Sequence, residues 1–328
     1  MKQSPKSQTN LNMQRDLKID GLKFLLIFLV VLGHLSYYDY GIELNKMIYS
    51  FHMPVFVFLS GYFTSLKSNS EKHAMWLKKT AIIFLLAQFA HIIMAVAFRY
   101  LSTTMSNTPP HQLLSLGDFI YPKIALWYLL CLIYWRLITW KVFDKSHDLL
   151  WLIGSFILSI IVGIIPIGET FSFQRAFAFF PFFILGLVFK QRNWAIQLDK
   201  VPLLIPVMII IIGFIVAREL PLFQPRYHYI DWGDAVLRAG QSILGCLLCL
   251  SVIRLSRASK LLEKFAHYGM YTLWIYVGHT FLITIERKLL PQFGITYNIF
   301  IALVIAVIYC ALFIFIAKLY HARHRQLE

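Results

Sequence analysis

The chain has 328 residues, of which 59% are hydrophobic and only 14% are charged. Soluble domains contain about 25% charged residues, so this composition excludes an ordinary soluble enzyme and indicates a polytopic membrane protein. The formal net charge of +15 comes mainly from basic residues between apolar runs. Membrane topology explains such a pattern, so we expect no nucleic-acid partner.

Ten apolar runs follow one another along the chain, each long enough to cross a bilayer as a helix. The predicted fold class is therefore all-α, a polytopic integral membrane protein with about ten transmembrane helices. We expect a polar cytoplasmic tail over residues 1–19, a membrane domain over 20–320 and a second cytoplasmic tail over 321–328. The ten runs lie at residues 21–38, 47–66, 81–98, 119–138, 149–167, 173–189, 201–217, 235–253, 271–285 and 299–319.

The distribution of basic residues predicts how the chain is oriented in the membrane. Of the 31 lysines and arginines, 22 fall in the two tails and the even-numbered loops or at their helix ends, and nine fall on the other side. An even number of crossings leaves both termini on one side, and the positive-inside rule makes that side the cytoplasm. We therefore expect a multi-pass protein of the cytoplasmic (inner) membrane, in contact with its lipids, with both termini cytoplasmic.

The first apolar run carries the most informative pair of residues, Lys23 and His34. Eleven residues are about three helical turns, so the two side chains share a face about 16 Å apart. A lysine at the membrane edge reaches the headgroups, but a histidine deep in hydrocarbon usually marks a pathway or a reactive site. This spacing favours a linear ligand with its anionic tail at Lys23 and its reactive end at His34. Since a neutral imidazole is a natural general base for a hydroxyl, His34 is the predicted catalytic residue.

Three further histidines lie inside predicted spans. His52, in the second run, has a depth similar to that of His34, so these two are expected to meet in the outer half of the bundle. His279, in the ninth run, is expected to be shallower and nearer the middle. Both are candidate substrate-binding residues, with the alternative that each bonds a neighbouring carbonyl and fixes helix packing. His91 has no evident partner and is interpreted as structural.

Four basic residues on the predicted cytoplasmic side are candidates for holding a phosphorylated donor. Lys78 and Lys79 precede the third run, close to the level of Lys23 and Arg15. Lysine binds phosphate as a point charge, so Lys23, Arg15, Lys78 and Lys79 form the predicted binding group for the phosphates of coenzyme A. The alternative for Lys78 and Lys79 is that they reflect topology alone.

Candidates for the acceptor lie mostly on the predicted outer side. Trp127 and Tyr128 open the fourth run, and Glu169 and Arg175 flank the start of the sixth. Aromatic and charged groups suit the face of a sugar, although aromatic residues also form interfacial belts. Ser60, in the second run, is a further substrate-binding candidate, with the alternative that Ser60 and Gly61 only permit close helix approach.

The four cysteines all fall inside predicted spans. Buried cysteines mostly behave as small hydrophobic residues, and thiolates are costly in lipid. We therefore interpret them as structural, including the Cys246-x-x-Cys249 pair, and expect no metal site.

Taken in order, several short strings resemble the integral-membrane acyltransferase 3 family, and within it the fucose 4-O-acetylase-like branch. The spacing of Lys23 and His34 fits a basic-x10-His signature in the first span of that family. The matching strings are Asp20-Gly-Leu-Lys23 followed by His34, Phe51-His-Met-Pro-Val-Phe-Val-Phe-Leu-Ser-Gly-Tyr-Phe63, Trp76-Leu-Lys-Lys79, Leu126-Trp-Tyr-Leu129, Phe180-Pro-Phe-Phe-Ile-Leu-Gly186 and Gly269-Met-Tyr-Thr-Leu-Trp-Ile-Tyr-Val-Gly-His279.

The resemblance implies ten transmembrane helices, an acyl-CoA donor that enters from the cytoplasm, and transfer to a glycan hydroxyl. It makes His34 the essential histidine and Lys23 its basic partner. Two features depart from the family pattern. Many members carry Arg-x-x-Arg at the entrance of the third span, but Ile82 stands where the second arginine would be. Some members append an extracytoplasmic hydrolase-like domain, which is not seen here, so we expect transfer to be completed in the membrane domain.

The predicted function is therefore an O-acyltransferase that uses acyl-CoA, with acetyl-CoA as the expected donor substrate. Its expected acceptor is a cell-envelope polysaccharide, such as a lipopolysaccharide, or its lipid-linked precursor. Two other classes stay open: a polysaccharide exporter or transporter, and a non-enzymatic subunit of envelope assembly. A transporter predicts symmetry between the two halves of the chain, and no such repeat is visible in the sequence. The sequence leaves open whether the transferred group is acetyl or a longer acyl group, and it leaves open the oligomeric state.

Overall fold

A computed structural model describes residues 16–35, 42–66, 69–106, 113–165, 170–222, 232–289 and 298–325. Within these ranges the regular elements are all helices, as the sequence predicts. Each of the ten predicted runs overlaps one helix of 15 residues or more. They are α1 (Leu17–Leu35), α2 (Ile42–Tyr62), α3 (Ser70–Ser106), α5 (Trp127–Lys141), α6 (Asp148–Ile164), α7 (Phe173–Gln191), α9 (Leu204–Glu219), α10 (Trp232–Ala258), α12 (Thr272–Leu289) and α13 (Ile299–Arg325).

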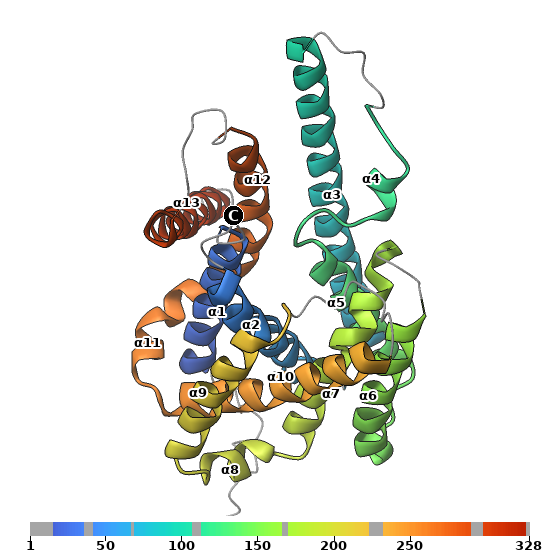
Figure 1. The fold of residues 1–328 in the computed structure, drawn as a ribbon, viewed down its shortest axis with the longest axis vertical. Helices are drawn as coiled ribbons and strands as arrows, with labels where there is room; N and C mark the ends of the chain where they lie inside the picture. The colour runs from blue at the N-terminus through green and yellow to red at the C-terminus, as the bar shows by residue number, and fades with distance from the viewer. Residues whose placement is uncertain are drawn as a thin grey trace, which may run out of the picture.

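Short helices lie between several of the long ones. These are α4 (Gly117–Ile120), α8 (Trp194–Asp199), α11 (Leu261–Phe265) and three 3₁₀ turns, Lys145–His147, Thr170–Ser172 and Ala266–Tyr271. α3 extends past the other helices at one end of the molecule, with α4 beside it, and α8 lies at the opposite end (Figure 1). The predicted topology assigns these two ends to opposite sides of the membrane.

Five helices in the described part of the chain are long and apolar enough to cross a membrane: α3, α6, α7, α10 and α13. Helices α5 and α9 have only 15 and 16 residues. The remaining three, α1, α2 and α12, carry charged residues near one end and polar residues further along. The predicted count of about ten crossing helices is therefore not confirmed. The polar residues that lower the hydropathy of α1, α2 and α12 include three of the histidines singled out above.

The centre of the bundle is formed by α7, which is buried over most of its length, and by α2 packed against it. A Cβ atom on Gly61 would collide with the carbonyl oxygen of Phe183, and one on Gly186 would collide with that of Phe58. Glycine at both positions lets the two backbones touch, which is the role that the sequence offered for Gly61. This contact holds the end of α2, with Ser60, in a fixed place.

The start of α1 is held by the segment that leads into α12. Asp16 accepts hydrogen bonds from the backbone amides of Lys18 and Ile19, so its side chain caps α1. Gly21 and Gly269 lie so close to the backbones of Leu262 and Asp20 that neither has room for a Cβ atom. α1 and the α11–α12 segment are thereby locked together at their first turns.

The predicted fourth span is divided. Its first residues form α4, and residues 121–126 then turn into the protein, where Ala125 and Leu126 are buried. α5 begins only at Trp127. The hydroxyl of Tyr276 donates a hydrogen bond to the carbonyl oxygen of Ala125, which holds this turn against α12. The start of α5 therefore lies inside the bundle and not at the outer membrane edge, where the continuous apolar pattern had put it.

Candidate functional site

His34 and His279 face each other across the contact between α1 and α12. Their ring centroids are 5.5 Å apart. His279 is buried, and its Nδ1 lies 2.9 Å from the carbonyl oxygen of Ile275. A carbonyl only accepts, so Nδ1 carries the proton and a neutral ring presents the lone pair of Nε2. This Nε2 has no hydrogen-bond partner among the described atoms, so it is available to a bound molecule.

The sequence put His279 shallower than His34, and the structure corrects this. The helical path toward His279 begins at Leu261, with α11 and a 3₁₀ turn ahead of α12. The helical path from Leu261 to His279 is therefore about as long in residues as the helix from Leu17 to His34. The glycine contacts described above align the two starting points. The two rings consequently reach the same level.

Other basic groups surround His34. His52, Arg175 and Arg287 all lie close enough to His34 to interact with it electrostatically. Arg287 also donates a hydrogen bond of 2.9 Å from Nη2 to the carbonyl oxygen of His34, which ties the end of α1 to α12. His52 donates from Nδ1 to the carbonyl oxygen of Ile48 at 2.6 Å, so its neutral ring also presents Nε2. The three histidines expected near the reaction thus form one cluster.

His91 has a partner that the sequence did not reveal. Its Nε2 lies 2.8 Å from the hydroxyl of Thr280, next to His279, and its ring stacks on Phe281 at 4.0 Å. The Thr280 hydroxyl donates to the carbonyl oxygen of Val277, so the histidine nitrogen is the donor in the other contact. His91 thereby braces α12 from α3.

Lys23 lines a pocket of about 230 Å³ at the other end of this region. Its ammonium lies 3.2 Å from a carboxylate oxygen of Asp20 and 4.1 Å from the centre of the Phe63 ring. Ser60 and Tyr128 share a hydrogen bond of 2.6 Å on the pocket wall. Lys23, Ser60 and Tyr128, three residues singled out from the sequence, therefore line one cavity. The remaining lining residues are Phe56, Leu59, Phe63, Leu132 and Arg136.

Arg136 is a member of this pocket that the sequence analysis missed, because it was counted only as a residue of topology. Its guanidinium stacks on Trp76 at 3.7 Å, and its Nε has no hydrogen-bond partner in the described structure. Two cations, Lys23 and Arg136, therefore line the same small cavity. This pairing across α1 and α5 depends on the inward start of α5, which no local pattern reveals.

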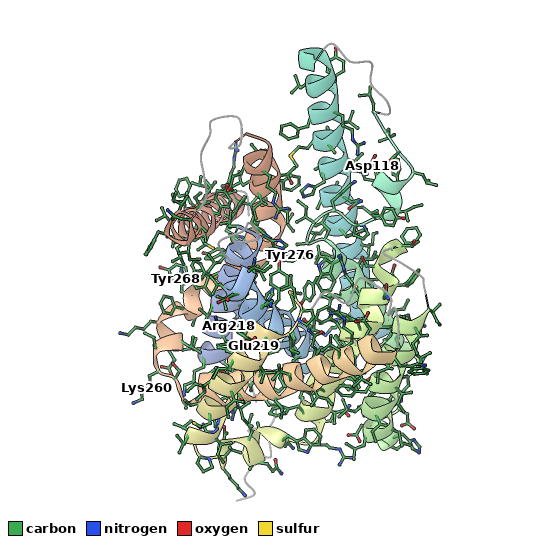
Figure 2. All side chains as sticks on the ribbon, in the orientation of Figure 1. Asp118, Arg218, Glu219, Lys260, Tyr268 and Tyr276 are labelled. Carbon is green, nitrogen blue, oxygen red and sulfur yellow. The ribbon has the colours of Figure 1, made fainter. Side chains whose placement is uncertain are left out.

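A series of aromatic rings connects the Lys23 pocket with the histidine pair. The ring of Tyr128 lies 5.6 Å from that of Tyr276, and Tyr276 lies 6.2 Å from His279. His279 in turn faces His34. Tyr276, labelled in Figure 2, was also missed by the sequence analysis, although its place one turn before His279 puts it on the same face of α12. The two ends of the predicted linear site are thus joined through side chains of α5 and α12.

Trp127 and Arg175 meet beside the histidine cluster. The guanidinium of Arg175 lies 5.5 Å from the centre of the Trp127 ring, which stacks on Phe179 at 5.2 Å. Arg175 is also an electrostatic neighbour of His34. Trp127 therefore faces the site from within the bundle and not from an interfacial belt, because α5 begins inside the protein.

Two of the predicted donor contacts lie apart from these groups. Lys78 and Lys79 are exposed on α3 and line neither the Lys23 pocket nor the histidine cluster. This agrees with the missing Arg-x-x-Arg pattern. Arg15 and Glu169 lie outside the described residues.

A comparison with known protein families finds one match that covers most of the chain. The family described as "Acyltransferase domain" matches residues 16–319, which includes every described residue of the site. No curated protein and no solved structure matches this chain.

Proposed function

The chain belongs to the acyltransferase 3 family, a family of membrane acyltransferases, because the family match covers most of its length, and from this we propose a specific reaction. The proposed reaction is transfer of an acyl group from acyl-CoA to a hydroxyl of an envelope glycan or its lipid-linked precursor. Acetyl-CoA is the proposed donor. The single observation that supports this most is the His34–His279 pair at the end of the ring series that starts in the Lys23 pocket.

The donor fits this arrangement by charge and by polarity. Lys23 and Arg136 provide positive charge at the end of the site nearer the predicted cytoplasm, where a phosphate group would lie. The uncharged arm would pass Ser60, Tyr128 and Tyr276, and its thioester would reach His34. A site enclosed by apolar helices excludes water and so limits hydrolysis of the thioester.

The transfer step needs a base and a place for the acceptor. His34 takes the proton of the acceptor hydroxyl, whose oxygen forms a bond to the thioester carbonyl carbon. The carbon–sulfur bond then breaks, and the thiolate leaves with the proton from His34. An alternative with the same net reaction is transfer of the acyl group first to His34 and then to the acceptor hydroxyl. His279, fixed by its bond to Ile275, would orient His34 or the acceptor through Nε2.

The acceptor would approach from the outer side, past His52, Arg175 and Trp127. An aromatic face and an adjacent guanidinium suit a hydroxyl-rich sugar. Both termini would be cytoplasmic, so the reaction would connect a cytoplasmic donor with an acceptor reached from the opposite face.

The experiment that tests this proposal compares envelope glycans by NMR from three strains. One carries the gene, one lacks it, and one expresses the His34→Ala variant at the same level. We expect O-acyl ester signals in the first strain only. Identical glycan spectra in all three strains would contradict the proposed reaction.

A further inference from the structure

A second cavity lies at the ends of α2, α6 and α7 on the predicted cytoplasmic side. Its volume is about 650 Å³, which is within the range of sites for small organic ligands. No local sequence pattern indicates this cavity, because its residues come from three separate segments of the chain. The lining residues are Thr64, Ser65, Leu66, Lys145, Asp148, Leu187, Lys190, Gln191 and Arg192.

Positive charge predominates in this cavity, with three basic residues and one carboxylate. Arg192 donates hydrogen bonds of 2.8 and 2.6 Å from Nε and Nη2 to Asp148, so that carboxylate is already neutralised. In the described part of the chain, neither Lys145 nor Lys190 forms an ion pair. Two ammonium groups without a protein counter-ion in one concave site favour a ligand that carries at least two negative charges.

Neutral hydrogen-bonding groups accompany the two lysines. Thr64 and Ser65 contribute hydroxyls, and the Oε1 of Gln191 is buried without a partner among the described atoms. A buried amide oxygen without a hydrogen bond is costly, so a donor group of a ligand would satisfy it. The exocyclic amino group of a nucleobase is such a donor.

The cavity adjoins the Lys23 pocket. Phe63 lines the Lys23 pocket, and its chain neighbour Thr64 lines this one. The ammonium of Lys190, which lines the second cavity, lies 5.8 Å from the centre of the ring of Tyr62, the residue before Phe63. Phe63 and Thr64 thus place the two cavities next to each other along the chain, as a long ligand that occupies both would require.

We infer that this second cavity binds the phosphorylated adenosine end of the acyl-CoA donor, with Lys145 and Lys190 on its phosphates. The inference rests on the proposed function and makes it more specific. The nucleotide would sit here, in place of the exposed Lys78–Lys79 pair, and the pantetheine arm would enter the Lys23 pocket. Lys145 and Lys190 would then add to the positive charge of Lys23 and Arg136, which would hold the diphosphate where the pantetheine arm begins.

Equilibrium binding of adenosine 3′,5′-bisphosphate to purified protein in phosphatidylcholine nanodiscs tests this inference, because that probe has the phosphates but no pantetheine. We expect binding by the wild type, and a loss of about 10-fold or more in affinity for Lys145→Gln and for Lys190→Gln. Lys190→Arg should retain part of the affinity, since the charge remains. The matched control is Lys260→Gln, an exposed lysine beside α11 that lines neither cavity (Figure 2) and should bind like the wild type. Thermal unfolding of each variant checks that it is folded.

Three results would overturn the inference: no binding by the wild type, wild-type affinity in both glutamine variants, or displacement of the probe by phosphatidylglycerol in the nanodisc. The last result would identify the cavity as a site for anionic lipid headgroups. Acyl transfer by the same preparations is measured separately. Transfer by the wild type with unchanged probe binding in the variants would refute only this site, whereas probe binding as expected without any transfer would refute only the proposed reaction.

Discussion

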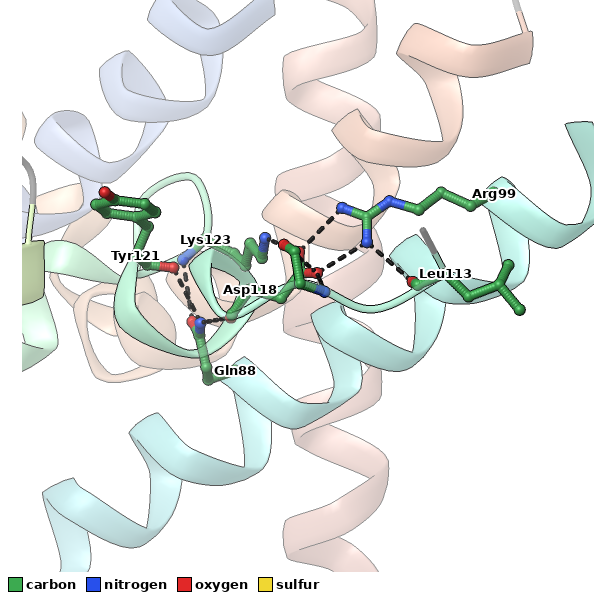
Figure 3. A network of polar contacts seen from close by, with 7 residues as sticks. Gln88, Arg99, Leu113, Asp118, Tyr121 and Lys123 are labelled. Carbon is green, nitrogen blue, oxygen red and sulfur yellow. Dashed lines mark hydrogen bonds and ion pairs between the residues drawn. The ribbon is translucent and has the colours of Figure 1, made fainter. Parts of the chain in front are cut away.

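Two charged regions of the molecule use their charges differently: the corner between α3 and α4, and the pocket around Lys23. At the corner, Asp118 is buried and accepts hydrogen bonds from Arg99 at 2.8 and 3.0 Å, from Lys123 at 2.7 Å and from Ser115 (Figure 3). The side-chain amide of Gln88 donates hydrogen bonds from Nε2 to the carbonyl oxygens of Asp118 and Tyr121, and its Oε1 accepts one from the backbone amide of Lys123. Each side chain of this network bonds to other groups of the protein, so the network holds the fold.

The Lys23 pocket has the opposite balance. Of its two cations, Lys23 pairs with the carboxylate of Asp20, and the guanidinium of Arg136 lies over the aromatic face of Trp76. Charges that are paired internally stabilise the fold, whereas cations that face a cavity with unused donors are prepared for an anion. The difference predicts that changes at the corner alter stability, and that changes around the pocket and the histidine cluster alter binding or reaction.

The largest effect is expected at the reactive end of the site. His34→Ala should reduce acyl transfer by at least about 10²- to 10⁴-fold, because it removes the general base, while donor affinity stays near the wild-type value. His91→Ala, which removes a bracing residue, is the control and should retain measurable transfer if folded. The measurement is release of free thiol from acetyl-CoA in the presence of acceptor glycan. Wild-type rates in a folded His34→Ala protein would refute the catalytic assignment.

Arg136 offers a test of the pocket that the sequence did not suggest. Arg136→Gln should weaken acetyl-CoA binding about 10-fold, since one charge-assisted contact to the donor is lost. Lys141→Gln, an exposed cation on the same helix, is the matched control and should leave the affinity unchanged. Titration of both variants with acetyl-CoA measures their affinities. An equal loss of affinity in the two would show that Arg136 acts through the overall charge of the protein and not through a contact with the donor.

The corner should respond in stability only. Asp118→Asn should lower the free energy of unfolding by about 1–3 kcal/mol, because it weakens charged hydrogen bonds in a buried network. Donor affinity should not change. Thermal unfolding and acetyl-CoA titration of the same sample measure the two quantities. A loss of affinity without a loss of stability would reverse the distinction drawn between the two regions.

The corner also predicts a pH dependence. The hydrogen bonds from Arg99, with those from Lys123 and Ser115, hold the pKa of Asp118 well below its ordinary range. A carboxylate whose pKa is lower in the folded state stabilises the fold above its unfolded pKa of about 4 and loses that contribution as pH falls below it. The wild type should therefore lose stability on acidification more steeply than Asp118→Asn. Parallel stability curves for the two proteins between neutral pH and about pH 3 would contradict this account.

Much of the fold was predictable from apolar run length, because each run requires a helix to satisfy its backbone hydrogen bonds in lipid. The Lys23–His34 spacing was also predictable, since it depends on a single uninterrupted helix. The roles of Arg136 and Tyr276 were not, because they follow from the inward turn at Ala125, a tertiary contact made by Tyr276 itself. The depth of His279 was misjudged for a similar reason: α11 and the following 3₁₀ turn lengthen the path into α12. Local pattern thus specifies helices and spacing along them, but not the alignment of helices from distant segments.

The account stands on the claim that Lys23 and His34 mark the two ends of one donor site, and titration of three proteins with acetyl-CoA tests it most directly. Purified wild type, Lys23→Ala and His34→Ala are compared at low and high salt. We expect Lys23→Ala to bind about 10- to 150-fold more weakly than the wild type, with the difference reduced in high salt, and His34→Ala to bind like the wild type. Equal donor affinity in Lys23→Ala and the wild type would reduce Lys23 to a membrane-edge residue and contradict the account.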